Sequence, residues 1–206
     1  MQIPSVIVFG TGNRKKGEEL AELFAATGIV LKTLADFDKK LDVVEDGHSF
    51  AENAVKKAKE QAVFLEHWVL AEDSGLSVDA LNGRPGIYSA RFSGEKATDA
   101  RNNELLLEKM KNIPDSKRTA RYTCHIALSD ASGRILAESE DICCGIIRHH
   151  LHGANGFGYD PLFEIPEYHK TFGELDPIIK KVISHRARAV RKMLNFIRNL
   201  IHASHS

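Results

Sequence analysis

No charge of one sign dominates this chain, and that lack excludes several kinds of protein. Lysine and arginine together number 28, aspartate and glutamate together number 28, and the formal net charge is therefore zero. A balanced chain has no long-range field that attracts nucleic acid or an anionic membrane. We therefore expect no nucleic-acid or membrane partner, and a local site must bind any polyanion.

Cysteine is also scarce. The three cysteines, Cys124, Cys143 and Cys144, form an odd set, and the adjacent two could form a disulfide only with strained geometry. The segment MQIPSVIVFG has no basic residue and too short an apolar stretch for a signal peptide, and no later run is long enough to span a membrane. These absences predict a soluble protein of a reducing, cytoplasmic compartment.

Hydrophobic residues make up 43% of the 206 residues, which is enough to bury one good core. Short apolar runs at 3–9, 29–35 and 67–71 predict strands. Helical spacing between the first two runs predicts a helix that Gly28 ends, carried by Leu20, Leu23, Phe24 and Thr27. The chain is thus expected to open with a strand, a helix and a strand.

Two further helices carry start signals. Ser49 and Glu52 have the S-x-x-E spacing of a capping box, and the residues that then repeat on one helical face are Phe50, Ala54, Ala58, Ala62 and Leu65. Thr98 is placed to cap a helix that reaches about Met110. Each signal predicts a helix whose apolar face packs on the core.

The remaining elements complete an α/β pattern. In residues 121–129 apolar side chains alternate, which predicts a half-buried strand, and DASG at 130–133 predicts a hairpin turn into a partner strand. Ser184 is placed to cap a final helix whose inward residues are Ala187, Val190, Met193, Leu194, Ile197 and Ile201. These elements predict one α/β unit around a mixed sheet, with ligands near the strand ends.

Residues 11–19, TGNRKKGEE, form the first of three glycine-bearing turns. Gly12 allows a tight turn, the following helix start offers unpaired N–H groups to an anion, and Lys16 can add charge. The stretch is not the Walker pattern, so by itself a helix start with solvated lysines is the favoured interpretation.

The second turn is AEDSG at 71–75. In extended backbone Glu72 and Asp73 would point to opposite faces, whereas in a turn their oxygens could converge on one hard cation. Asp73 could instead accept backbone N–H bonds, as Asp-Ser-Gly turns often do.

The third turn is GANGFGYDPLF at 153–163, where Phe157 and Tyr159 lie among glycines. Exposed rings there would suit stacking on a base, worth about 1–3 kcal/mol, and core packing of Phe157 is the competing interpretation. Further on, Lys180, His185 and Arg186 are expected at the start of the final helix, where a solvated basic face would also explain them. The histidines of HHLHG at 149–153 match no zinc spacing.

Together these stretches resemble the family of inosine triphosphate pyrophosphatases, also called non-canonical purine NTP pyrophosphatases. The resemblance covers nearly the whole chain through TGNRKKGEE, SFAENAVKKA, AEDSGLSVDALNGRPGIYSARFSGE, GFGYDPLF, and KTFGEL followed by KKVISHRARA. It implies a single elongated domain, residues 1–206, with a central mixed sheet flanked by helices and an active-site cleft between two lobes.

The resemblance also implies a reaction and a site. Water would hydrolyse ITP, dITP or XTP to the monophosphate and pyrophosphate, with Mg²⁺ as cofactor, Asp73 as general base, and a homodimer as the default assembly. The family motif gives Asp73, Glu72 and Glu45 as metal ligands, although relatives often have Asp at position 72 and a Glu-Glu pair where this chain has Glu45-Asp46. The substrate residues it implies are Thr11, Gly12, Asn13, Lys16, Lys57, Ser74, Phe157, Gly158, Tyr159, Asp160, Lys180, His185 and Arg186.

Rival functions differ in what they predict. A non-catalytic nucleotide sensor would use the same pocket without releasing pyrophosphate. A related pyrophosphatase could act on pyrimidine or modified nucleotides. An RNA-binding role is disfavoured because the chain has no basic stripe.

Overall fold

A computed structural model describes residues 4–11, 17, 20, 21, 24, 28–38 and 41–203, with side chains as far as residue 200. Contacts divide the chain into two compact units. Unit 1 consists of Met1–Asp73, Cys124–Asp141 and Arg186–Ser206, and unit 2 consists of Ser74–Thr123 and Ile142–His185. None of the helices in the described part of the chain is long and apolar enough to cross a membrane.

Seven strands form one mixed sheet in the order β2-β1-β3-β4-β5-β6-β7, as the sequence predicts for the fold class. β1 runs parallel to β2 and β3, whereas β6 runs antiparallel to β5 and β7. The chain passes between the two units within β3, β4 and β5. The strands are β1 (Val6–Phe9), β2 (Val30–Thr33), β3 (Val69–Val78), β4 (Thr119–Ser129), β5 (Ile135–Ile147), β6 (Phe163–Ile165) and β7 (Lys170–Thr171).

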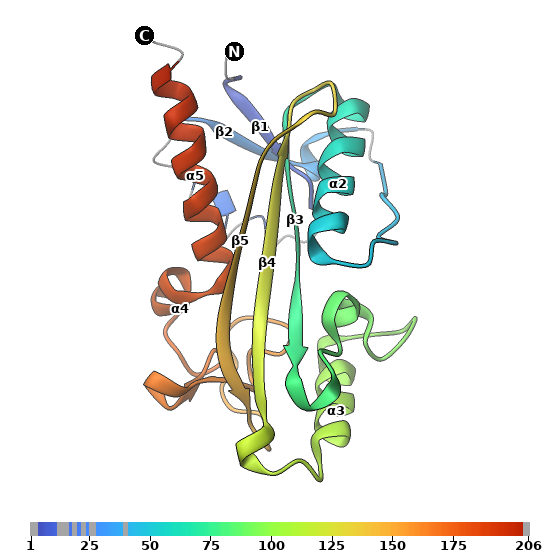
Figure 1. Cartoon of the computed structure of the whole chain (residues 1–206), viewed down its shortest axis with the longest axis vertical. Coiled ribbons are helices and arrows are strands. Elements are labelled where there is room, and N and C mark those ends of the chain that lie inside the picture. Colours follow the sequence, from blue (N-terminus) through green and yellow to red (C-terminus); the bar gives the residue numbers. More distant parts are fainter. Residues whose placement is uncertain are drawn as a thin grey trace. The chain divides into compact units, whose positions relative to one another are not determined.

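In unit 1 a helix covers each face of the sheet, α2 (Phe50–Leu65) on one and α5 (His185–Ala203) on the other (Figure 1). Successive strand residues point to opposite faces, so each strand contributes to two cores. The core under α2 contains Val8, Val69, Ala71, Ala127, Ala54, Ala58 and Ala62. The core under α5 contains Ile7, Phe9, Leu70, Cys124, Ile126, Leu128, Val190, Met193 and Ile197.

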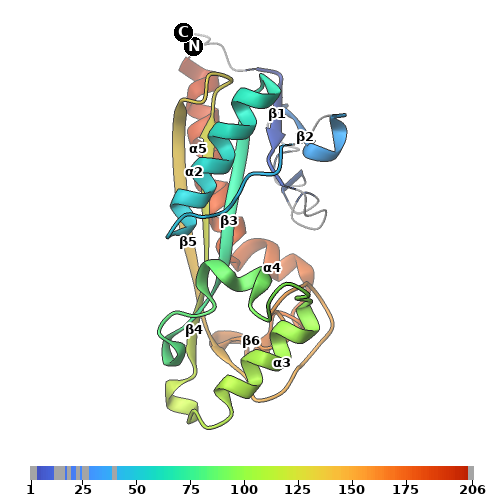
Figure 2. The same cartoon turned by 90° about the vertical axis from the view of Figure 1, so that its right-hand side faces the viewer.

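Unit 2 has its own aromatic core, with α3 (Asp99–Met110) and α4 (Pro177–Ile183) among its elements (Figure 2). The ring of Phe163 lies 4.6 Å from that of Tyr122 and 5.5 Å from that of Phe172, measured between centroids. The aliphatic side chains of Leu106 and Met110 from α3 belong to the same buried cluster. Each unit therefore buries its own apolar side chains.

The helix starts at Ser49 and Thr98 are confirmed. The Ser49 hydroxyl accepts the Glu52 N–H at 3.1 Å, and the Thr98 hydroxyl accepts the Arg101 N–H at 3.2 Å. The Glu52 carboxylate accepts from the His48 N–H at 2.7 Å, one residue earlier than the capping box predicts. These bonds satisfy helix N–H groups that have no partner within the helix.

The structure corrects two strand predictions. β3 continues through Glu72 and Asp73 to Val78, so the acidic pair stands in extended backbone and the predicted turn at 71–75 is wrong. β4 is buried on both faces from Tyr122 onward, and the prediction of a half-buried strand is therefore wrong. In unit 1 the reason is that α2 and α5 cover opposite faces, which removes the solvated side.

Other predicted elements are confirmed in part. Gly17, Leu20, Ala21 and Phe24 are helical, and Leu23 and Thr27 lie outside the described residues. The Gly133 N–H donates to the Asp130 carbonyl at 3.0 Å in the turn between β4 and β5. The predicted inward residues of α5 are buried as far as Ile197, and the side chain of Ile201 lies outside the description.

Three elements were not predicted from the sequence: α4, β6 and β7. Lys180 consequently lies on α4 and not at the start of the final helix. Ser184 ends α4, where its N–H donates to the Lys180 carbonyl at 3.0 Å, and α5 begins at the next residue. A local signal for α4 was present: Asp176 accepts the Ile178 N–H at 2.8 Å and Pro177 opens the helix.

Candidate functional site

Asp73 lies on the face of β3 that α2 covers. Ala71 packs under α2, and because the strand alternates, the next residue on that face is Asp73. Asp73 is 7% exposed, and its carboxylate accepts a hydrogen bond from the Asn53 Nδ2 at 3.0 Å. The Lys57 ammonium, one helical turn after Asn53, lies 3.5 Å from the other carboxylate oxygen. The predicted general base is therefore buried, hydrogen-bonded and charge-paired.

The segment before α2 supplies a second carboxylate to the same place. Lys57 Nζ donates to Glu45 Oε1 at 2.9 Å, so one ammonium contacts two carboxylates. The Gly47 N–H donates to Asn53 Oδ1 at 2.8 Å. We call the group formed by Glu45, Asn53, Lys57 and Asp73 the Asp73 cluster. All four residues belong to unit 1.

Glu72 lies on the opposite face of β3. The Arg186 guanidinium donates to its two carboxylate oxygens from Nε at 2.8 Å and from Nη2 at 3.1 Å. The Cys124 thiol lies 3.2 Å from Glu72 Oε2, and the glutamate and arginine are each 3% exposed. Glu72 therefore does not converge with Asp73, because extended backbone directs neighbouring side chains apart.

A second group of predicted residues meets in unit 2. Lys180 Nζ donates to Asp160 Oδ2 at 2.6 Å and lies 4.7 Å from the centre of the Phe157 ring. The Phe157 N–H also donates to Asp160 Oδ2, at 2.9 Å. We call Phe157, Asp160 and Lys180 the Phe157 cluster. Gly156 has φ 79°, and a Cβ there would overlap the Asp160 carboxylate, so the turn requires glycine.

Tyr159 is not the exposed stacking ring that the sequence suggests. It is 3% exposed, and its hydroxyl donates to the Ser89 carbonyl at 2.8 Å. Burial, with a smaller contribution from the charge of Asp99, raises the pKa of Tyr159 well above its usual range. His185 is also buried, and its ring stacks on Tyr122 with 4.7 Å between centroids. Both rings are core residues of unit 2.

The remaining predicted residues are distributed along the chain. Thr11 is half-buried and follows β1 after Gly10, and Ser74 is half-buried in β3. The Gly158 carbonyl accepts from Asn103 Nδ2 at 2.9 Å. Gly12, Asn13 and Lys16 lie outside the described residues. Among the described site residues, the structure brings together the Asp73 cluster and the Glu72–Arg186 pair in unit 1 and the Phe157 cluster in unit 2.

Comparison with known proteins shows the family of the chain. The sequence profile of the Ham1 family matches residues 7–196. The chain belongs to the Ham1 family. It is 50% identical to the dITP/XTP pyrophosphatase of Rhodopirellula baltica, over 96% of this chain and 95% of that protein, and 46% identical to that of Desulforamulus reducens, over 94% and 96%. The structure of a HAM1 protein from Coxiella burnetii matches with TM-score 0.87 and 36% identity, over 94% of this chain and 98% of that one.

Asn53 of the Asp73 cluster was not predicted from the sequence of this Ham1 chain. Asn53, Lys57 and Gln61 follow each other at four-residue intervals on the alanine-rich face of α2, and all three are buried. A polar stripe on a face that packs against a sheet is a signal that could have found Asn53. Gln61 continues the stripe towards Gly10, where an added Cβ would come within 2.0 Å of Gln61 Oε1. Alanine at position 10 would thus require that side chain to move.

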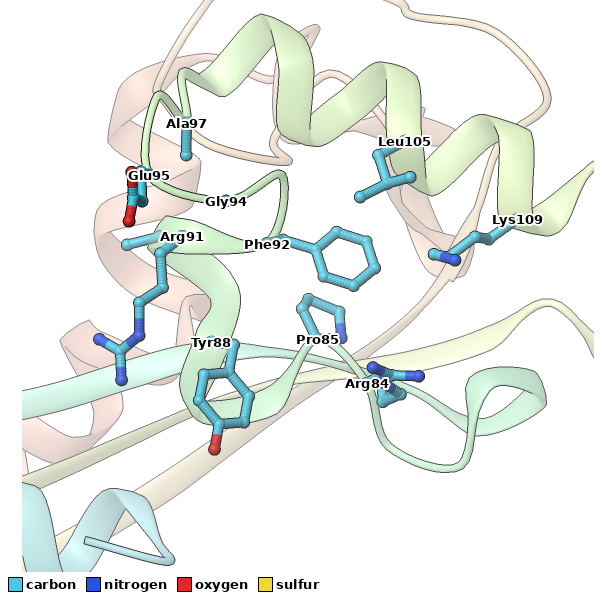
Figure 3. A pocket seen from close by; sticks show the side chains of 11 residues that line it. Arg84, Pro85, Tyr88, Arg91, Phe92, Gly94, Glu95, Ala97, Leu105 and Lys109 are labelled. Atoms are coloured by element: carbon cyan, nitrogen blue, oxygen red, sulfur yellow. The ribbon is translucent and has the colours of Figure 1, made fainter. Parts of the chain in front are cut away.

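This Ham1 chain also has an open pocket in unit 2, with a volume of about 950 Å³ (Figure 3). Tyr88, Arg91 and Glu95 lie at one end, and Arg84 and Lys109 lie at the other, beyond Pro85 and Phe92. The Arg91 guanidinium is 5.2 Å from the centre of the Tyr88 ring. Its charged side chains are all exposed, and no predicted site residue lines it.

Proposed function

We propose that this chain hydrolyses non-canonical purine nucleoside triphosphates, dITP, XTP and ITP, to the monophosphate and pyrophosphate. Close curated relatives bear the name dITP/XTP pyrophosphatase. The observation that carries the proposal is Asp73, a buried carboxylate fixed by an amide and an ammonium. A carboxylate held in this way can orient water and accept its proton, and no covalent nucleophile is required.

The basic and backbone groups would bind the triphosphate. Lys57 brings a positive charge to within 3.5 Å of Asp73, where it can neutralise charge that grows on phosphate oxygens in the transition state. By family motif, the other residues proposed for the phosphates are Thr11, Gly12, Asn13, Lys16 and Ser74.

The oxygen donors of the Asp73 cluster fit Mg²⁺. This ion is usually bound by one or two carboxylates together with substrate phosphates and water, and Glu45 and Asp73 already contact a common cationic atom. We propose these two as ligands. Glu72 does not fit, because its carboxylate is buried in a fork with Arg186 on the other face of β3. When bound, the ion would supply charge neutralisation at the phosphates.

The Phe157 cluster is proposed to bind the base and sugar. Phe157 is half-buried. Asp160 accepts hydrogen bonds from the Phe157 N–H and from the Lys180 ammonium, so the position of the ring relative to the ammonium is fixed. Gly158, Tyr159 and His185 would shape the pocket, Tyr159 as a buried support. The Arg186 side chain is occupied by Glu72, so we do not assign it to reading of the base.

The assembly and location complete the proposal. A homodimer is the default expected from the family, and hydrolysis of free nucleotides fits the cytoplasmic location that the sequence predicts. Gel filtration with light scattering would check the assembly by giving the mass of the particle relative to the 22.9 kDa chain.

The test is release of pyrophosphate from a panel of triphosphates with Mg²⁺, repeated with the metal chelated. We expect dITP, XTP and ITP to be hydrolysed well, ATP and GTP poorly, and all activity to stop on chelation. Binding of dITP without pyrophosphate release would favour the nucleotide sensor. Preference for a pyrimidine triphosphate would favour the related pyrophosphatase and overturn the purine proposal.

A further inference from the structure

The amide of Asn53 bonds both Asp73 and the backbone of the segment that carries Glu45. Its Nδ2 donates to Asp73 Oδ2 at 3.0 Å, and its Oδ1 accepts from the Gly47 N–H at 2.8 Å. Gly47 lies two residues after Glu45, so one side chain bonds the base and the segment that carries the second carboxylate. Asn53 is 0% exposed, so water does not compete for either bond.

The chemistry of the partners fixes the orientation of this amide. A backbone N–H can only donate, so the group facing Gly47 must be the carbonyl oxygen. An ionised carboxylate can only accept, so the group facing Asp73 must be the NH₂. Both partners require the same orientation. A flipped amide would place its oxygen against the Asp73 carboxylate, which is acceptor against acceptor, and its NH₂ against the Gly47 N–H, which is donor against donor.

We propose that Asn53 is a positioning residue for hydrolysis: it holds Asp73 in one orientation and ties the segment 45–47 to it. The inference rests on the proposed function and deepens it, since Asp73 is the base there. Only a side chain with a donor and an acceptor of this length makes both bonds. Aspartate would keep the acceptor for Gly47 and lose the donor to Asp73.

Gly47 shows how closely the segment approaches the amide. A Cβ on Gly47 would lie 2.7 Å from Asn53 Oδ1 and 2.8 Å from Glu52 Cβ. Alanine at this position would therefore push the segment and the amide apart without removing any group of the Asp73 cluster. Gly47→Ala thus perturbs the same connection from the other side.

The alternative is that Asn53 only fills buried space at the start of α2. In that case its replacement would lower stability, and the catalytic constants would change no more than for another buried asparagine. Asn102 is the matched control: it is 3% exposed, accepts from the Ser93 N–H at 2.9 Å and donates to two carbonyls in unit 2, without contact to the Asp73 cluster.

The experiment compares Asn53→Asp, Asn53→Ala, Gly47→Ala and Asn102→Ala with the unmodified full chain. Three quantities are measured: kcat and KM for dITP, hydrogen exchange at the Gly47 amide without nucleotide or metal, and the urea midpoint. Loss of an outer-shell partner typically lowers activity by about 10- to 100-fold, and we expect that fall in kcat for both Asn53 variants. KM should change less than about threefold, because the triphosphate contacts remain.

Hydrogen exchange at Gly47 distinguishes loss of the bond between Asn53 and Gly47 from loss of the bond between Asn53 and Asp73. In Asn53→Asp the Gly47 amide should stay protected while kcat falls, because the acceptor for Gly47 remains, whereas the donor to Asp73 is lost and a second carboxylate faces Asp73 in its place. In Asn53→Ala and Gly47→Ala the amide should exchange about tenfold faster, the range expected when one hydrogen bond is lost. Asn102→Ala should lower the urea midpoint and leave kcat within about threefold of the unmodified chain.

Each outcome supports or overturns the role of Asn53 as a positioning residue. The inference is overturned if folded Asn53→Asp keeps kcat within threefold of the unmodified chain, or if Asn102→Ala loses as much kcat as Asn53→Ala. If the Asn53 variants do not fold, unchanged kcat and Gly47 exchange in Gly47→Ala would overturn it. If the unmodified chain itself releases no pyrophosphate, the proposed function fails instead, and that result is distinct from an active chain with an unaffected Asn53→Asp variant.

Discussion

At the scale of single residues, the Glu72–Arg186 pair is a structural element of unit 1. Both residues are 3% exposed, and two guanidinium nitrogens of Arg186 donate to the two carboxylate oxygens of Glu72. Removing one partner of a buried pair leaves an uncompensated charge, which typically costs about 3–5 kcal/mol. We therefore expect Arg186→Ala to lower the free energy of unfolding by that amount in urea melts. The double variant Glu72→Leu with Arg186→Met should recover much of the loss, and a single variant that loses less than about 1 kcal/mol would contradict the assignment.

Asp73 gives the second prediction at this scale. Asp73→Asn keeps the shape of the side chain but cannot accept a proton, and general base catalysis contributes about 10²–10⁴ in rate. We expect kcat for dITP to fall by at least about 10² while equilibrium binding of dITP remains measurable by calorimetry. A variant that keeps more than about a tenth of the kcat would show that another group activates water.

Tyr159 gives a prediction at alkaline pH. Burial raises its pKa above the value of 10.0 for an unperturbed tyrosine, so the folded chain binds the phenolic proton more tightly than the unfolded chain does. This contribution to stability is fully present below about pH 10 and is lost as the pH rises further. Melting temperatures of the unmodified chain should therefore drop as the pH rises above about 10, and those of Tyr159→Phe should drop less. Equal slopes would exclude Tyr159 as the cause.

At the scale of elements, the cap of α2 connects stability with the site. Ser49→Ala removes the hydroxyl that accepts the Glu52 N–H, and loss of such a cap typically costs about 1 kcal/mol. Thr98→Ala removes the equivalent bond from α3 in unit 2. We expect similar losses in the free energy of unfolding for both variants, and a fall in kcat only for Ser49→Ala, since α2 carries Asn53 and Lys57. Equal kcat values in the two variants would show that the end of α2 does not affect the Asp73 cluster.

Helices that begin with a capping residue could be predicted from the sequence, whereas very short strands could not. Ser49 and Thr98 bond within their own first helical turn, so the sequence alone located α2 and α3. β6 and β7 have three and two residues, which is too short for any periodicity. The site divides in the same way: family motifs indicated Asp73 and Lys57, whereas the fork between Glu72 and Arg186 joins residues 114 positions apart, a contact that only the folded chain makes.

At the scale of the whole molecule, we expect local hydrogen bonds to carboxylates to contribute to the acid response of stability. The pKa values of five are lowered, chiefly by hydrogen bonds: a backbone bond from Thr33 for Asp36, side-chain bonds from Lys56, His149 and Ser132 for Asp46, Asp115 and Asp130, and a backbone bond from Thr171 for Glu174. Asp130 is half-buried and the other four are exposed, and each of those four contributes little alone because solvent screens it. All five lowered pKa values change stability in the same direction as the pH falls.

The sign follows from linkage. A carboxyl whose folded pKa is depressed contributes stability above its unfolded pKa, near 4, and loses it as the pH falls through the folded value. The urea midpoint should therefore be constant between about pH 5 and 7 and fall steadily towards pH 3. Salt screens the pairs with Lys56 and His149 but leaves the bonds from Thr33, Ser132 and Thr171, so 0.5 M NaCl should reduce the fall without removing it. A midpoint unchanged at pH 3, or an acid response abolished by salt, would show that these local bonds do not contribute to the acid response of stability.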